Sequence, residues 1–236
     1  MKGYIEDKEF GKIYVELRRG MTSVRFGFHA DGNLLMRAPL GTSAGFLKDV
    51  IDRNRERLRA LPRPDVPDFF FGQVIGCLGC HAIIEPTNPR PGYVTTRWEG
   101  DTLHVQVHAE TDLTDFSTKQ FLSDRISYAM EYKAQQVLLP LARQVADSLG
   151  LKPAGFEIGR GMRKLGHCTT KKVIQLSRNL MFMPVELVRY IICHELAHLI
   201  HMNHSPEFHA LCNQYCGGKE KELERQLRQF RFPILK

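Results

Sequence analysis

The segment His194-Glu195-Leu196-Ala197-His198 carries the strongest chemical signal in the chain. Residues four apart on an α-helix lie about 40° apart around its axis, so the two imidazoles project from one face. That spacing lets two histidine nitrogens bind one metal ion. It also places Glu195 beside the metal, where its carboxylate can act as general base on a bound water. The segment therefore predicts a zinc-dependent hydrolase.

The surroundings of this segment favour a metal over two hydrogen-bonded core histidines. The helix predicted to open after Pro184 is otherwise apolar, which indicates that it is buried. Burying two imidazoles and a carboxylate together is costly unless something compensates, and a metal ion does so.

A third ligand is expected because catalytic zinc takes three protein ligands and a water, whereas structural zinc takes four ligands. His204 follows Asn203, a residue that can end a helix, and Ser205-Pro206 begins the next helix. A tight turn between the two helices can swing His204 back toward the pair. The alternatives are His201, which is still on the helix, and a later carboxylate from Glu220, Glu222 or Glu224.

Other groups with possible chemistry are less well placed by the sequence. Candidate donors to the developing oxyanion of a peptide substrate are His167, Arg163 and Tyr190. Cys77 and Cys80 could hold a second metal with His81, Cys212 or Cys216, but free thiols packed as small hydrophobic groups are the commoner outcome. The same Cys77–His81 segment matches a haem attachment site, which needs export and is not expected here. His104 and His108 lie four apart on a predicted strand, about 13 Å from each other, too far to share a metal.

The composition indicates a globular protein of 236 residues, with 43% hydrophobic and 25% charged residues. The first residues have no apolar core, so no secretory signal is expected, and the six cysteines are expected to be reduced. No apolar run reaches the roughly 18 residues of a membrane span. We therefore expect a cytoplasmic protein with no membrane partner. The net charge of +7 leaves nucleic acid as a possible partner.

The predicted elements give an α+β fold in two parts. Residues 1–112 are β-rich, with a hairpin formed by 24–28 and 34–37 and one helix that starts at Thr42 or Ser43 and runs to 58. Further strands are predicted over 13–15, 69–75, 93–98 and 102–108. The outer face of the helix carries Arg53, Arg55, Arg57 and Arg59.

Residues 113–236 are predicted to be mainly helical. A long helix capped by Ser117 runs to Leu149, with a kink or break at Pro140. Short strands over 154–162 and 173–177 precede the helix that carries His194. Further helices begin at Pro206 and at about Lys219.

The stretch His194-Glu-Leu-Ala-His-Leu-Ile-His-Met-Asn-His-Ser-Pro-Glu-Phe208 resembles the YgjP-like metallopeptidase family, which is related to the SprT-like zinc proteases. The resemblance extends to Arg37-Ala-Pro-Leu-Gly-Thr-Ser, to Asn54-Arg-Glu-Arg-Leu58 and to Gly166-x-Cys168. It implies a zincin-type catalytic lobe with one Zn²⁺ bound by His194, His198 and His204, and with Glu195 as base.

Three positions depart from the family pattern. Leu165-Gly166-His167-Cys168 stands where the family usually has Trp-Gly-Ser-Cys, Ser177 replaces an asparagine, and His209 replaces a tryptophan. The metal set is intact while the wall of the cleft is altered, so the family's substrate preference does not carry over.

Two functions of different classes follow from the sequence. The first is a zinc metallopeptidase that acts on a peptide or protein substrate. The second is a nucleic-acid-associated binding protein with a mainly structural zinc site, or a SprT-like protease recruited to DNA, supported by the net charge and the arginines of the first helix. The sequence does not determine the oligomeric state.

Overall fold

The computed structural model describes residues 2–29, 31–61, 67–87, 93–159 and 164–235. The chain divides into two compact units, Met1–Val66 and Pro67–Lys236. The sequence placed the change of character later, at 112/113. The difference arises because the strands between 74 and 108 share a hydrophobic core with the long helix that follows them.

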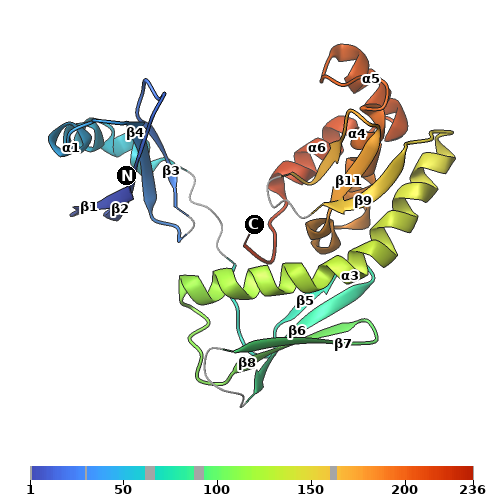
Figure 1. Ribbon diagram of the computed structural model, residues 1–236, viewed down its shortest axis with the longest axis horizontal. Helices are drawn as coiled ribbons and strands as arrows, with labels where there is room; N and C mark the ends of the chain where they lie inside the picture. The colour runs from blue at the N-terminus through green and yellow to red at the C-terminus, as the bar shows by residue number, and fades with distance from the viewer. Residues whose placement is uncertain (1, 30, 62–66, 88–92, 160–163, 236) are drawn as a thin grey trace. The chain divides into compact units, whose positions relative to one another are not determined.

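The first unit is a four-stranded sheet in the order β1-β2-β4-β3, with two helices packed on its core (Figure 1). The expected hairpin is confirmed, with Phe26 opposite Met36 in antiparallel strands, whereas β1 was not expected. The expected single helix is divided at Asn54, and it begins where Ser43 accepts a hydrogen bond from the Phe46 amide. The elements are β1 (Lys2–Asp7), β2 (Gly11–Arg18), β3 (Arg25–Phe28), β4 (Leu34–Pro39), α1 (Ala44–Arg53) and α2 (Arg55–Arg59).

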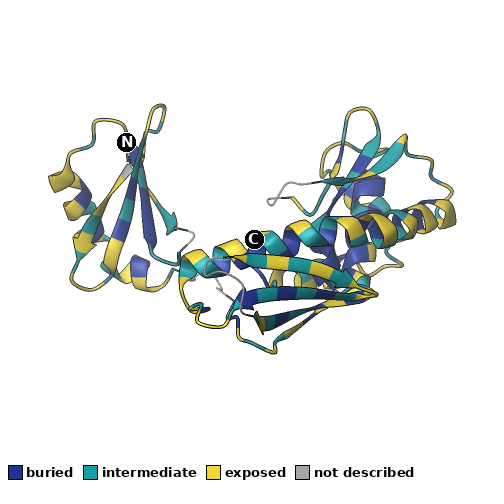
Figure 2. Ribbon diagram, turned by 60° about the horizontal axis from the view of Figure 1, so that its bottom comes forward, coloured by how far each residue is buried: buried dark blue, intermediate teal, exposed yellow. Residues whose placement is uncertain are grey.

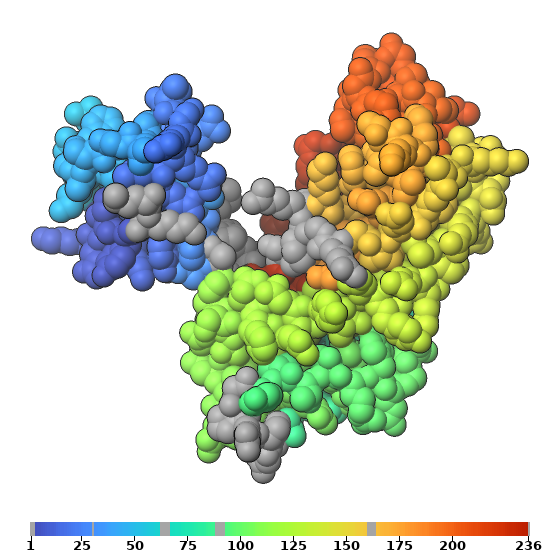
Figure 3. Space-filling view, viewed as in Figure 1, coloured from blue at the N-terminus to red at the C-terminus, as the bar shows by residue number. Residues whose placement is uncertain are grey.

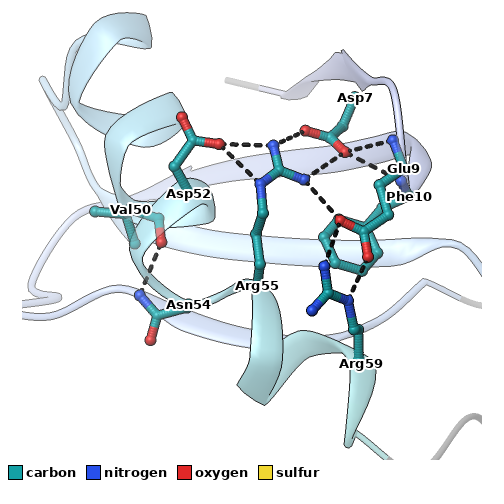
Figure 4. A network of polar contacts seen from close by, with 8 residues as sticks. All are labelled: Asp7, Glu9, Phe10, Val50, Asp52, Asn54, Arg55 and Arg59. Carbon is teal, nitrogen blue, oxygen red and sulfur yellow. Dashed lines mark hydrogen bonds and ion pairs between the residues drawn. The ribbon is translucent and has the colours of Figure 1, made fainter.

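Arg55 ties the helices of this unit to the turn between β1 and β2 (Figure 4). Its guanidinium donates to Asp7 at 2.9 Å, to Glu9 at 3.1 Å and to Asp52 at 2.6 Å. Arg59 donates to the other oxygen of Glu9. The hydrogen bond from Arg55 lowers the pKa of Asp7 to about 2. Two of the four arginines predicted on the outer face are therefore paired with acids of the same unit.

The second unit begins with a four-stranded sheet in the order β5-β6-β8-β7. Leu103, Val105 and Val107 of β8 are buried in alternation, as the sequence predicts, and the strands of this sheet show alternating bands of burial in Figure 2. The apolar residues from Phe69 onward do not form the expected strand, because the strand starts at Val74, while Phe69 packs into the core. The elements are β5 (Val74–Cys77), β6 (Cys80–Thr87), β7 (Val94–Glu99) and β8 (Thr102–His108).

The long helix α3 (Phe116–Ser148) packs on this sheet and on the C-terminal elements. Its N-cap is Asp115, which accepts from the Thr118 amide, rather than the expected Ser117. The helix runs through Pro140 without ending there, and Figure 1 shows it curving between its green and yellow ends.

The remaining elements form a three-stranded sheet in the order β10-β11-β9 and the helices that follow it. β9 and β11 are parallel, and β10, which was not expected, pairs antiparallel with β11 at the edge. The elements are β9 (Gly155–Gly159), β10 (Gly166–Cys168), β11 (Val173–Ser177), the 3-10 helix η1 (Arg178–Phe182), α4 (Val185–Ala197), α5 (Pro206–Tyr215) and α6 (Glu220–Gln229).

The described residues thus form a mixed α+β fold with several small sheets, in agreement with the expected fold class. None of their helices is both long enough and apolar enough to cross a membrane.

Candidate metal centre

Helix α4 carries His194 within its last turn, and His198 follows as its C-cap residue. The helix starts after Pro184, and its apolar side chains, including Val188 and Ile192, are fully buried. It packs on α3, and the space-filling view shows the orange and red segments beside the yellow end of α3 (Figure 3). A helix fixed on several sides holds the two imidazoles in place.

His204 lies in the turn between α4 and α5, as the sequence predicts. Ser205 caps α5 by accepting a hydrogen bond from the Phe208 amide, and Pro206 occupies the first turn. The turn brings the Nε2 atom of His204 to 3.1 Å from Nε2 of His194. One ligand nitrogen from each of His194, His198 and His204 lies within 4.8 Å of the others.

The alternative third ligands are engaged elsewhere. Glu220 pairs with His209 at 2.8 Å, Glu222 with Arg225 and Glu224 with Arg228. His201 contributes its backbone carbonyl to the site, since that oxygen lies 2.8 Å from Nδ1 of His198. Among the described residues, the three histidines are the one group of three or more potential ligands that converges in this way.

The protonation states suit metal binding. A carbonyl can only accept, so Nδ1 of His198 carries the proton and its Nε2 keeps a free lone pair. Burial, reinforced by the other histidines, lowers the pKa of His194 to about 4 and also lowers the pKa of His198. Both rings are therefore neutral at pH 7, the form that binds metal.

The ring of Phe208 contacts all three imidazoles. Its ring stacks on His198 with centroids 4.4 Å apart and meets His194 and His204 edge-on at 4.9 and 4.8 Å. The side chain is fully buried. Sequence patterns assigned Phe208 no role beyond the family-like stretch that it ends, although its position in the first turn of α5, four residues after His204, is the signal that could have indicated one.

Glu195 points from α4 to the edge strand β10. Its side chain is buried, with 6% of the residue exposed, and burial raises its pKa to about 7. The backbone amide of Cys168 in β10 donates to the carboxylate and partly offsets this effect. The site therefore contains a carboxyl group that exchanges a proton near neutral pH, one residue from a metal ligand.

The candidate oxyanion donors lie around this site at different distances. The buried Tyr190 ring meets that of His194 at 6.2 Å, and burial raises the pKa of its hydroxyl. His167 is exposed on β10, on the strand face opposite to Gly166 and Cys168. Arg163 lies outside the described residues. The geometry therefore singles out no donor.

Five of the six cysteines fall into two clusters, and the sixth, Cys168, lies beside Glu195. Cys77 and Cys80 face each other across the two-residue turn of the β5–β6 hairpin. Cys193 lies close to Cys216 and Cys212, and its thiol donates to the Tyr215 carbonyl at 3.6 Å. In the described part of the chain neither cluster supplies three converging ligands, so a second metal gains no support there.

A cavity of about 650 Å³ opens behind α4, between the C-terminal end of α3 and α6. Tyr190, Cys193 and Cys216 are among its lining residues, and the three histidines are not. The histidine site is thus separate from this cavity.

Comparison with known proteins places the chain in a class of metal-dependent peptidases. Residues 22–230 match the family model described as YgjP-like, metallopeptidase domain. The chain belongs to this family, as the sequence motifs indicate. A search of curated proteins finds no match.

Two solved structures show partial similarity. One is the metallopeptidase zymogen jannalysin of Methanocaldococcus jannaschii, at 26% identity over 39% of this chain and 94% of that chain, with a TM-score of 0.35. The other is the metallopeptidase zymogen abylysin of Pyrococcus abyssi, at 24% identity over 39% and 93%, with a TM-score of 0.36. The membership of the chain in the YgjP-like family rests on the match over residues 22–230.

Proposed function

We propose that the chain is a zinc-dependent peptidase that binds one Zn²⁺ through His194, His198 and His204 and uses Glu195 as general base. The observation that carries the proposal is the convergence of three imidazole nitrogens within 4.8 Å, next to a buried carboxyl group on the same helix.

The donor set fits zinc. Zinc–nitrogen bonds of about 2.0–2.1 Å at tetrahedral angles put two ligand nitrogens about 3.4 Å apart. Nε2 of His194 and Nε2 of His204 are 3.1 Å apart, so small shifts bring the set to that geometry. Neutral imidazoles favour zinc over Mg²⁺ or Ca²⁺, which take oxygen ligands.

Residues of the chain would supply the proton transfers of the reaction. A bound zinc supplies a water of lowered pKa and polarises the substrate carbonyl. Glu195 would accept the proton of the attacking water and would pass it to the leaving amine, because it is a buried carboxyl group one residue from His194 on the same helix. The Cys168 amide holds the carboxylate against β10, so it is aimed before substrate arrives.

An extended peptide can bind along the outer edge of β10. On the side that faces β11, the Leu165 carbonyl accepts a hydrogen bond from the Ser177 amide, and the Thr169 amide donates to the Val173 carbonyl. By alternation, the backbone groups of Gly166 and Cys168 face away from β11, and the Cys168 amide donates to Glu195. A substrate strand added at this edge would place its carbonyl beside the base. This edge supports a peptide as the substrate class.

The nucleic-acid alternative loses part of its basis. Arg55 and Arg59 are held by Asp7, Glu9 and Asp52 and so are not poised for phosphates. The net charge of +7 remains as its support. Binding of DNA that falls steeply with salt and is insensitive to a chelator would favour it.

The substitution Glu195→Gln tests the proposal. It removes the base and no ligand, so zinc content should stay at one per chain, while hydrolysis of a fluorescence-quenched peptide library should fall about 10²–10⁴-fold. The matched control is Glu186→Gln, an exposed glutamate in the first turn of the same helix, which should retain both zinc and activity. Full activity in the Glu195→Gln variant would refute the mechanism.

A further inference from the structure

The Glu195 side chain occupies the space that a side chain at position 166 would need. A methyl group built on the Gly166 Cα would lie 2.6 Å from Cγ, 2.6 Å from Oε1 and 2.9 Å from Cδ of Glu195. Carbon atoms in contact prefer about 3.5–4.0 Å. Any side chain at position 166 would therefore collide with the carboxyl arm along most of its length.

Backbone conformation does not explain the glycine. The φ angle of Gly166 lies outside the left-handed region that favours glycine, unlike that of Gly150 at +68°. An L-amino acid could adopt this φ angle without strain. The lack of room for a side chain is therefore what requires glycine at this position.

The Glu195 side chain has little freedom to move aside. It is buried, it starts from a helix that packs on β10, and its carboxylate accepts the Cys168 amide hydrogen bond on the same strand. Relief of the collision would require another rotamer, which would take the carboxylate away from the Cys168 amide.

We propose that Gly166 is a positioning residue for Glu195, because its missing side chain lets the carboxylate lie in the narrow gap between α4 and β10. The inference rests on the proposed function, in which Glu195 is the general base. It assigns a role to the one glycine of β10, which sequence reasoning used only as part of the family resemblance.

Activity of Gly166→Ala is the first readout. The expected result is a fall in kcat of about 10²-fold or more, the size of a lost general base, with zinc still at one per chain and KM changed by less than about threefold. The control is Gly159→Ala in β9 of the same sheet, where the added methyl would meet its nearest atoms at 3.7 Å, an ordinary contact. Wild-type kcat in Gly166→Ala, or loss of zinc, would overturn the proposal.

Stability supplies a second readout that does not depend on activity. Gly166→Ala should lower the unfolding midpoint, followed by the fluorescence of Trp98, the one tryptophan of the chain. In the Glu195→Ala background the collision is gone, so Gly166→Ala should leave the midpoint unchanged. Equal shifts in both backgrounds would show that Gly166 does not act through Glu195 and would overturn the proposal.

The two readouts separate this inference from the proposed function. If Glu195→Gln proves fully active, the peptidase mechanism fails, yet the stability coupling between Gly166 and Glu195 can still be measured. If Glu195→Gln is inactive and the coupling is absent, the peptidase mechanism holds and the role of Gly166 is refuted.

Discussion

Two clusters of polar side chains in this molecule handle charge in opposite ways. Around Arg55, each carboxylate faces a guanidinium, and the hydrogen bond from Arg55 lowers the pKa of Asp7 to about 2. Around α4, three imidazoles converge on one another, and burial raises the pKa of Glu195 to about 7. The acids and arginines of the first cluster pair with one another, and the second cluster gathers the donors that a divalent cation requires.

The difference separates a structural from a functional use of polar side chains. Arg55 contacts acids on β1, on the following turn and on α1, so its bonds hold elements of one unit together. The histidine site instead brings three imidazole nitrogens together beside a buried carboxyl group whose pKa is raised, the kind of shift that is common at functional sites. The following predictions test this contrast.

The largest effect is expected for Phe208→Ala. Removing a fully buried phenylalanine costs about 3–5 kcal/mol of unfolding free energy. Because the ring also supports all three imidazoles, zinc affinity should fall about 10–100-fold, the range seen for groups that orient ligands. Competition with a chromogenic chelator measures the affinity.

The matched control is Phe69→Ala, a buried phenylalanine in the same hydrophobic core but outside the site. It should destabilise the unit by a similar amount and leave zinc affinity unchanged. Equal loss of affinity in both variants would mean that Phe208 has no specific role at the histidines.

A smaller effect is expected for Arg55→Met in the first unit. Asp7 has a pKa of about 2, below its ordinary 3.8, chiefly because Arg55 donates a hydrogen bond to it, so this pairing stabilises the unit above about pH 4 and the stabilisation is lost as the pH falls through 2. The variant should therefore be less stable than the wild type at pH 7, and the gap should close near pH 2. Hydrogen exchange of β1 and α1 in the full chain measures the difference.

Trp98 lies in the second unit and serves as the internal reference for that experiment. Its fluorescence transition should not shift in Arg55→Met, and Arg53→Met should leave exchange in β1 unaltered. A stability gap that stays constant between pH 7 and pH 2 would contradict the pairing of Asp7 with Arg55.

Local patterns predicted the parts of the site that are close in sequence. The spacing of His194 and His198 and the cap at Ser205 indicated the three converging histidines, because helix geometry and capping are local rules. The strands with clear alternation, such as β8, were also predicted. That His204 binds zinc as the third ligand stays a prediction.

Long-range packing was not predictable in the same way. β1 has the mixed residues of a charged surface and is a strand because β2 pairs with it. The boundary between the units lies at 66/67 because β5–β8 pack on α3, which no composition change signals. The approach of Gly166 to Glu195 joins residues 29 positions apart and is visible only in three dimensions.

The most direct test of the account is the zinc content of the purified wild type beside His204→Ala and His201→Ala, measured by elemental analysis. The account predicts one zinc per chain in the wild type and in His201→Ala, and a large loss in His204→Ala alone. Zinc retained in His204→Ala, or none in the wild type after zinc supplementation, would contradict the three-histidine site.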